Sequence, residues 1–141
     1  MKFALVVSQF NEKISQGLQK GALAFLDEKK VPLQSIKVFY VPGAFEIPLV
    51  AQKLAKSTRF DGIICLGAVI KGETAHFEMI SLGATTGLMQ AILATEVPMS
   101  FGILTTYTED QALVRSQENA ENKGREAAQA CFETVHLLRE L

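Results

Sequence analysis

Residues 61–78 have the side chains whose types and spacing best suit chemistry. The apolar, β-branched run over 62–66 predicts a strand that is buried on both faces. Polar residues follow it, and the chain reaches His76 by way of Lys71 and Glu73. An open α/β sheet binds its ligand beyond the carboxyl ends of its parallel strands. The stretch therefore predicts a ligand site with an imidazole available for proton transfer.

Other chemically suited side chains also come at the ends of predicted strands. Phe10 follows a strand over 3–8 and could stack on a planar ring, although a single aromatic residue is more often part of a core. Glu46 follows a strand over 36–41, and its carboxylate could either favour a helix dipole or, if buried, accept hydroxyl groups. Phe101 carries the same caution as Phe10.

Arg115 has two interpretations, as a solvated helix residue or as a phosphate ligand. In the second case it would act with backbone N–H groups of residues 72–74, which precede a helix. The sequence has no Walker-type loop, no dinucleotide glycine fingerprint and no metal-ligand cluster. The residues alone thus indicate a small ligand that is partly planar and partly phosphorylated.

The elements that position these residues alternate as βαβαβαβαα. Helical periodicity follows the first strand, with Asn11 as a candidate cap, and recurs from about 44, 80, 108 and 123. The order predicts an α/β fold: one flavodoxin-like three-layer αβα sandwich over residues 1–141, with a four-stranded parallel sheet. The small residues of 83–87 predict a closely packed neighbour from this chain or from another copy.

The 141-residue composition is that of an ordinary globular domain, with a net charge of −1. This balance predicts neither nucleic-acid nor anionic-membrane binding. The sequence contains no continuous apolar run of bilayer length and no expected signal peptide. Cys65 and Cys131 lie in apolar contexts and are predicted to be reduced core thiols, which favours a cytoplasmic protein. His136 is assigned no function.

Five segments together resemble the 6,7-dimethyl-8-ribityllumazine synthase family over nearly the whole chain. They are QFN, VPGAFEIP, LGAVIKGETAHFE, FGILTT and ENKGREAA. The resemblance implies an enzyme of riboflavin biosynthesis that condenses 5-amino-6-(D-ribitylamino)uracil with 3,4-dihydroxy-2-butanone 4-phosphate and releases phosphate and water. It implies no metal and no organic cofactor.

The resemblance also implies a role for each matching residue, with His76 as the proton donor and shuttle. Residues expected to hold the pyrimidine and its ribityl chain are Phe10, Ala44, Phe45, Glu46, Ala68, Val69, Ile70 and Phe101. Residues expected to hold the butanone phosphate are Glu73, Thr74, Arg115 and Lys123.

Members of this family build their sites between the subunits of a pentamer, so the resemblance implies that Phe101 and Arg115 face ligand held by the next chain. The short break before the last helix is typical of members that form a 60-subunit shell, and riboflavin synthase is a possible partner. Lys71 stands where many members have Arg. The chain begins two residues before its first strand, so most of the family's N-terminal arm is expected to be missing.

Alternatives from other classes stay open. They are a non-catalytic flavin- or lumazine-binding carrier, a purely structural shell component, and an archaeal-type riboflavin synthase. A carrier would have no need of His76 or Arg115, and a shell component would have no need of the polar loop over 71–76, so the enzyme is favoured.

Overall fold

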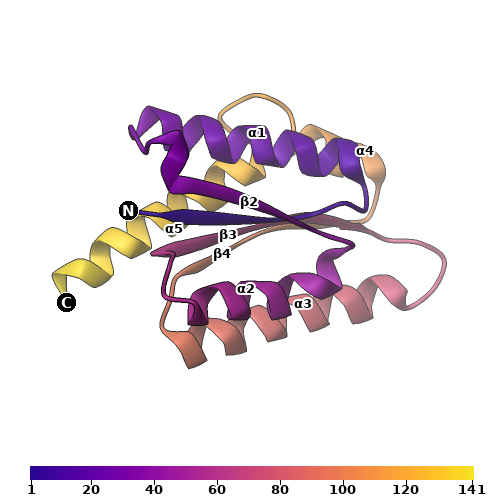
Figure 1. Ribbon diagram of the computed structural model, residues 1–141. Helices are drawn as coiled ribbons and strands as arrows, with labels where there is room; N and C mark the ends of the chain where they lie inside the picture. Colours follow the sequence, from indigo (N-terminus) through magenta and orange to yellow (C-terminus); the bar gives the residue numbers. More distant parts are fainter.

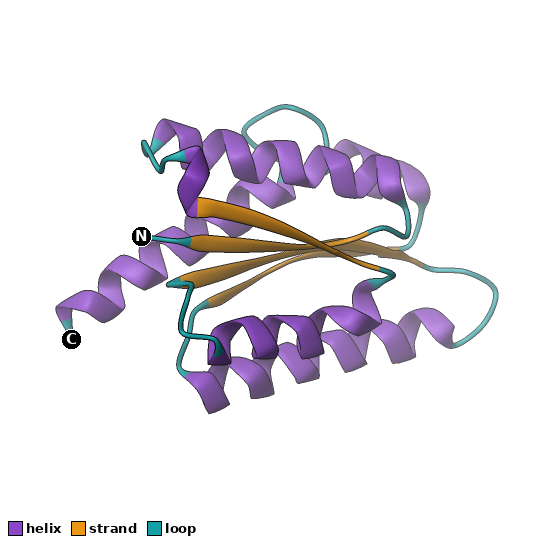
Figure 2. Cartoon of the chain, in the orientation of Figure 1, coloured by secondary structure: helices purple, strands orange, loops and turns teal.

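Four parallel strands form one sheet in the order β2-β1-β3-β4 in the computed structural model, which describes all 141 residues. The strands are β1 (Phe3–Ser8), β2 (Ile36–Val41), β3 (Gly62–Ile70) and β4 (Met99–Thr106). Helices α1 (Glu12–Glu28), α4 (Glu109–Val114) and α5 (Lys123–Glu140) cover one face, and α2 (Ile47–Lys56) and α3 (His76–Thr95) cover the other (Figures 1 and 2). The predicted three-layer α/β sandwich with its four-stranded parallel sheet is confirmed.

The carboxyl ends of all four strands lie at one edge of the sheet. Ser8 of β1 is in register with Val41 of β2, and Ile70 of β3 is in register with Thr106 of β4. β3 is central and longer than predicted, because it stays paired with β4 four residues beyond Leu66. The edge therefore brings together the segments that follow each strand.

Each face of the sheet has its own core, built from alternate strand residues. Leu5 and Leu66 pack under α1 and α5, whereas Val6 and Cys65 pack against α2 and α3. Complete burial of such a side chain contributes roughly 1.5–3 kcal/mol. Both cysteines are buried and free, as predicted, and burial raises the pKa of the Cys131 thiol to about 12.

Helix α3 begins at His76, four residues earlier than predicted. Its small residues face its own chain: an added Cβ at Gly83 would lie 3.2 Å from Phe45 Cε1, and one at Gly87 would lie 3.0 Å from Pro48. The close neighbours are thus Phe45 and the first turn of α2, and the small residues give no support to a contact with another copy.

By length and composition alone, helix α3 could cross a membrane. Of its 18-residue apolar window, 22% is buried within the sandwich. A helix of this kind was not predicted from the sequence, which has no continuous apolar run of bilayer length. Gly, Ser and Thr interrupt the apolar run. The mean hydropathy of the helix is still high because Glu78 is its single carboxylate. Several apolar side chains on α3 are exposed to solvent: Met79, Leu82, Met89 and Leu93.

The two candidate caps behave differently. Thr108 and Gln111 form the capping box that their spacing predicts at the start of α4. Asn11 does not cap α1 with its side chain: its backbone is left-handed, and its amide nitrogen donates to the Ala68 carbonyl. Helix α4 ends at Val114, so Arg115 follows the helix instead of lying within it.

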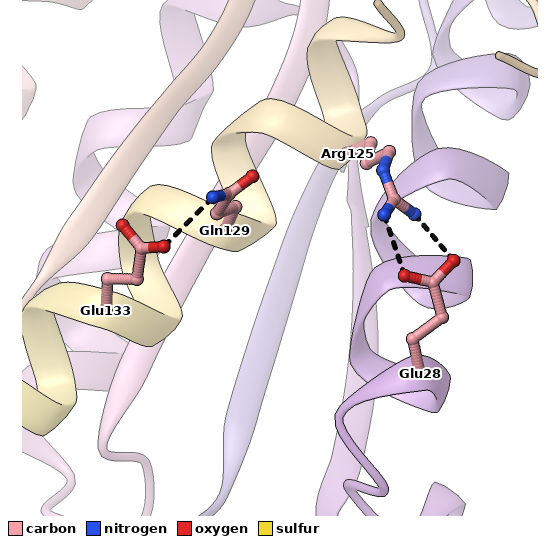
Figure 3. Close-up of polar contacts among 4 residues, drawn as sticks. All are labelled: Glu28, Arg125, Gln129 and Glu133. Carbon is pink, nitrogen blue, oxygen red and sulfur yellow. Dashed lines mark hydrogen bonds and ion pairs between the residues drawn. The ribbon is translucent and has the colours of Figure 1, made fainter. Parts of the chain in front are cut away.

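Helices α1 and α5 meet along a close contact, called here the α1–α5 seam. A Cβ at Gly124 would overlap the carbonyl oxygen of Leu18. The buried Asn122 side chain accepts from Arg125 N–H at 3.0 Å and donates to the Gly17 carbonyl at 3.1 Å. Arg125 in turn forms a two-pronged ion pair with Glu28, at 2.9 and 2.7 Å (Figure 3). The polar side chains of the seam thus find their hydrogen-bond and ion-pair partners within the single chain.

Candidate functional site

A cavity of about 430 Å³ opens at the carboxyl edge of the sheet, on the side covered by α2 and α3. The segments after β1 and β2, the end of β3 and the start of α3 all contribute to it. Its lining residues are Phe10, Pro42, Gly43, Ala44, Phe45, Glu46, Ala68, Val69, Ile70, His76 and Ile80. Eight of these eleven are residues that the sequence analysis nominated, so segments far apart in the chain do converge on one place.

Two aromatic rings stand at the mouth of the cavity, with Phe10 70% and Phe45 60% exposed. Phe10 is fixed through its backbone, since its N–H donates to the Pro42 carbonyl at 3.0 Å. An aromatic side chain that is mostly exposed yet rigidly mounted is a suitable platform for a flat ring. Phe10 is therefore not a core residue.

Glu46 ends a short 3₁₀ turn, Ala44–Glu46, that leads into α2. Pro48 falls within the first turn of the following helix, where proline is tolerated. The Glu46 side chain is exposed and folds back over Gly43, where an added Cβ would lie 3.2 Å from Oε2. Of the two interpretations, burial is thus wrong; the carboxylate lies at the rim, where ligand hydroxyl groups can reach it.

His76 is the first residue of α3, and its side chain is exposed to the cavity. Its backbone N–H donates to Thr74 Oγ1 at 3.4 Å, which ties the preceding loop to the helix start. Glu73 and Thr74 lie exposed in that loop beside the positive end of the helix dipole. An anion bound there would lie close to an imidazole able to move protons.

Lys71 forms an ion pair with Glu78 at 3.3 Å and lies over the Tyr107 ring. The pKa of Glu78 is lowered, chiefly by a hydrogen bond from its own backbone N–H and further by Lys71. Both partners are about half exposed, so their pairing adds little to stability. The pair joins the end of β3 to the first turn of α3 and so borders the loop that contains Glu73.

Five nominated residues do not line the cavity: Glu73 and Thr74, in the loop beside it, and Phe101, Arg115 and Lys123, which lie farther along the chain. Phe101 lies on the outer strand β4 and is 37% exposed. Arg115 follows α4, and its Nη1 donates to the Gln111 carbonyl at 3.0 Å. Lys123 N–H donates to the Arg115 carbonyl at 2.9 Å, so Arg115 and Lys123 are neighbours. Together they form a second group, separate from the cavity within one chain.

Three lining residues, Pro42, Gly43 and Ile80, were not assigned a role from the sequence. Ile80 lies one helical turn after His76, a spacing that would have placed it on the same face had the helix start been recognised. Pro42 and Gly43 connect β2 to the 3₁₀ turn that contains Phe45, and they line the cavity there.

The chemistry of the cavity is that of aromatic surface, backbone groups, one carboxylate and one imidazole. The structure contains no group of three or more His, Cys, Asp or Glu side chains arranged to hold a metal ion. A hollow of about 570 Å³ beside α1 and the loop before α5 is larger, but only two of its eleven lining residues are apolar. It offers no aromatic surface for a planar ligand.

Comparison with known proteins gives one consistent family. Residues 1–139 match the family model described as 6,7-dimethyl-8-ribityllumazine synthase. A protein of Caulobacter vibrioides named 6,7-dimethyl-8-ribityllumazine synthase 1 is 57% identical over 99% of this chain and 92% of its own length. Proteins named 6,7-dimethyl-8-ribityllumazine synthase from Salinibacter ruber and Syntrophus aciditrophicus are 51% and 50% identical, over 90% and 92% of their lengths and 99% and 100% of this chain.

Proposed function

The chain belongs to the 6,7-dimethyl-8-ribityllumazine synthase family, and from that premise we propose how its cavity makes the product. It is a transferase of riboflavin biosynthesis. The reaction joins 5-amino-6-(D-ribitylamino)uracil to 3,4-dihydroxy-2-butanone 4-phosphate and releases phosphate and water. The observation that carries the proposal is that Phe10, Glu46 and His76, from three separate segments, line one cavity.

The pyrimidine lies against the Phe10 ring, with its polar edge toward the backbone of residues 68–70. The ribityl chain runs past Ala44 and Phe45, and Glu46 accepts its hydroxyl groups. A carboxylate suits this role, because its two oxygens can accept several hydrogen bonds at once. These contacts hold the amine of the pyrimidine at a fixed place in the cavity.

The butanone phosphate lies at the start of α3, where backbone N–H groups of Glu73 and Thr74 meet the helix dipole. Arg115 and Lys123 supply the remaining positive charge. Because both lie away from the cavity within one chain, they act on the phosphate held by a neighbouring copy, and Phe101 likewise faces the neighbour's pyrimidine. This division of labour is what a site between subunits requires.

His76 moves protons as the pyrimidine amine attacks the ketone carbon and water leaves to give an imine. Phosphate elimination follows, and attack of the ribityl-bearing nitrogen on the remaining carbonyl carbon closes the ring and expels a second water. An imidazole can give and take protons near neutral pH, so one group serves successive steps. Most of the acceleration comes from holding two reactants together, since correct orientation alone can lower a barrier by several kcal/mol.

The test is a mixing assay with purified protein and both substrates, in which the lumazine is followed optically and phosphate is measured in parallel. Matched appearance of both products above the slow uncatalysed reaction is the expected result. Tight binding of the pyrimidine or of riboflavin without acceleration would instead indicate a carrier. Conversion of the lumazine onward to riboflavin would indicate a riboflavin synthase.

The oligomer proposed is a pentamer, with a 60-subunit shell and enclosed riboflavin synthase as its larger form. Its support is the apolar surface left exposed by one chain over α3 and the segment before α2, including Leu82, Leu93 and Phe45. Large apolar side chains left exposed in one region are a feature of protein–protein contacts. Sedimentation of the purified protein distinguishes monomer, pentamer and shell.

Two further assignments are part of the proposal. Residues 1–141 form one domain, which is supported by the packing of every element on a single sheet. The protein is cytoplasmic, which is supported by two buried, unpaired cysteines in a chain that needs no disulfide. Limited proteolysis and cell fractionation test these assignments.

A further inference from the structure

The residue after Phe10 has an unusual backbone and an unexpected hydrogen bond. Asn11 adopts the left-handed conformation, with φ 61° and ψ 52°, and its side chain leaves the start of α1 uncapped. Its Nδ2 group instead crosses to the neighbouring strand and donates to the Ala68 carbonyl at 3.0 Å. Asn at a helix start normally accepts a bond from the helix, so the use of its amide as a donor elsewhere needs an explanation.

The bond completes a two-sided attachment of the Phe10 turn. On one side, Gln9 N–H donates to the Val41 carbonyl at 2.8 Å and Phe10 N–H donates to the Pro42 carbonyl at 3.0 Å. On the other side, Asn11 reaches the end of β3. The backbone carrying the exposed Phe10 ring is therefore fixed to both strands that flank β1.

Asn meets both requirements of this position, whereas related residues meet one. The left-handed region is readily adopted by Gly, Asn and Asp and is costly for most other residues. Gly has no side-chain donor, and an ionised Asp can only accept. The combination of backbone conformation and cross-strand donor thus points to Asn specifically.

We propose that Asn11 is a positioning residue for the pyrimidine: its amide holds the Phe10 platform at a set distance from the strand end at residues 68–70. The proposal rests on the proposed function, in which the pyrimidine lies between these two surfaces. Asn11 acts through Phe10, and the butanone phosphate does not depend on it.

The decisive variant is Asn11→Gly, which keeps the left-handed backbone and removes the donor. The expected result is a rise of about fivefold to tenfold in KM for the pyrimidine, the size expected for one lost hydrogen bond, with kcat and the KM for butanone phosphate changed less than about twofold. Asn11→Asp fits the same backbone but sets an acceptor against the Ala68 carbonyl, so it should raise the KM for the pyrimidine at least as much. The matched control is Lys30→Gly, which places Gly at the same φ of 61° beyond the other end of α1 and should leave all kinetic constants unchanged.

A double-mutant cycle with Phe10→Ala separates positioning from direct contact. If Asn11 acts through the Phe10 ring, Asn11→Gly should have little further effect once the ring is removed. Additive losses, or a Phe10→Ala background in which Asn11→Gly still raises KM severalfold, would overturn the proposal. So would an unchanged KM in Asn11→Gly alone.

Calorimetric titration of the pyrimidine alone, without the second substrate, keeps the inference separate from the activity. If wild-type protein binds the pyrimidine but does not form lumazine, the proposed reaction fails, while the ratio of wild-type to Asn11→Gly dissociation constants still tests the positioning role. If wild-type protein does not bind the pyrimidine, both proposals are overturned.

Discussion

The helix pairs on the two faces of the sheet differ in how much of their surface is packed and hydrogen-bonded within the single chain. Helices α1 and α5 meet in a seam of close backbone contacts with a buried, fully hydrogen-bonded Asn122. Helix α3 also closely approaches Phe45 and the first turn of α2, through Gly83 and Gly87, yet it leaves four large apolar side chains exposed. The cavity described above opens on this second side, where apolar side chains remain exposed. One face therefore satisfies its helix contacts within the single chain, whereas the other leaves the cavity and apolar side chains open, as the proposed ligand and subunit contacts require.

The largest effect is expected in the α1–α5 seam, from Gly124→Ala. The added Cβ would overlap the Leu18 carbonyl, which is backbone and cannot rotate away. We expect a loss of ~3 kcal/mol or more in the free energy of unfolding, measured by urea denaturation. The matched control is Gly72→Ala, where an added Cβ meets nothing within 4 Å and stability should be unchanged. A stable Gly124→Ala protein would mean that the seam is looser than described.

The next effect concerns the exposed side of α3. Leu82→Glu places a carboxylate in the proposed subunit contact, where it would lose about 2 kcal/mol of apolar burial at each copy and add a desolvated charge. We expect dissociation to smaller species in sedimentation velocity, with loss of activity and retained helical content. Leu137→Glu, on an exposed position of α5, is the control and should leave the assembly intact. Equal behaviour of the two variants would contradict the comparison of the two faces.

Arg115→Ala should lower kcat/KM for the butanone phosphate by roughly a hundredfold or more, because a phosphate would be left with an unpaired charge. The KM for the pyrimidine should change little. Arg139→Ala, which removes an arginine at the other end of the same layer, serves as the control. Wild-type kinetics for Arg115→Ala would remove this residue from the site.

His76→Ala should reduce kcat by about tenfold to a hundredfold, the usual share of acid–base catalysis when water can substitute. Its thermal stability should match wild type, since the side chain is exposed and packs in neither core. His136→Ala tests the other histidine, whose Nδ1 lies 2.9 Å from the Phe132 carbonyl on α5. Only the His76 variant should lose turnover; an equal loss in both would argue against a proton shuttle at His76.

Most of the fold could be predicted from the sequence, because apolar periodicity and turn residues specify elements locally. The end of β3 could not, since Gly67 is read as a turn. Within the sheet Gly67 is required instead by close approach, because an added Cβ would lie 2.6 Å from Ser8 Oγ. The start of α3 was missed because Ala75 offers no capping side chain. Both errors arise from contacts that only the folded chain supplies.

The cavity was predictable because strand ends must share one edge of a parallel sheet. The second group, Arg115 and Lys123, could be assigned a ligand only through the family resemblance, since one chain does not bring it to the cavity. Asn11 shows a different limit. Its residue type predicts a helix cap, but the left-handed backbone turns the side chain toward Ala68.

The smallest expected effect is an acid-dependent one in the seam, at the exposed pair of Glu28 and Arg125 (Figure 3). The hydrogen bond from Arg125 lowers the pKa of Glu28 below its usual value of 4.5. A carboxyl with a lowered pKa in the folded state stabilises the protein above its usual pKa, and this contribution is lost as pH falls through the lowered value.

Glu28→Gln should therefore be slightly less stable than wild type at pH 7, and the difference should shrink as pH falls below 4.5. Thermal unfolding of both proteins, measured at intervals of about one pH unit from pH 3 to pH 7, shows whether the difference in stability shrinks toward acid. Glu133→Gln, which removes a carboxylate whose partner is the neutral amide of Gln129, should not reproduce it. A difference that grows toward acid would show that Arg125 is not the group that stabilises the ionised Glu28, and the seam would then owe its stability to close packing and Asn122 alone.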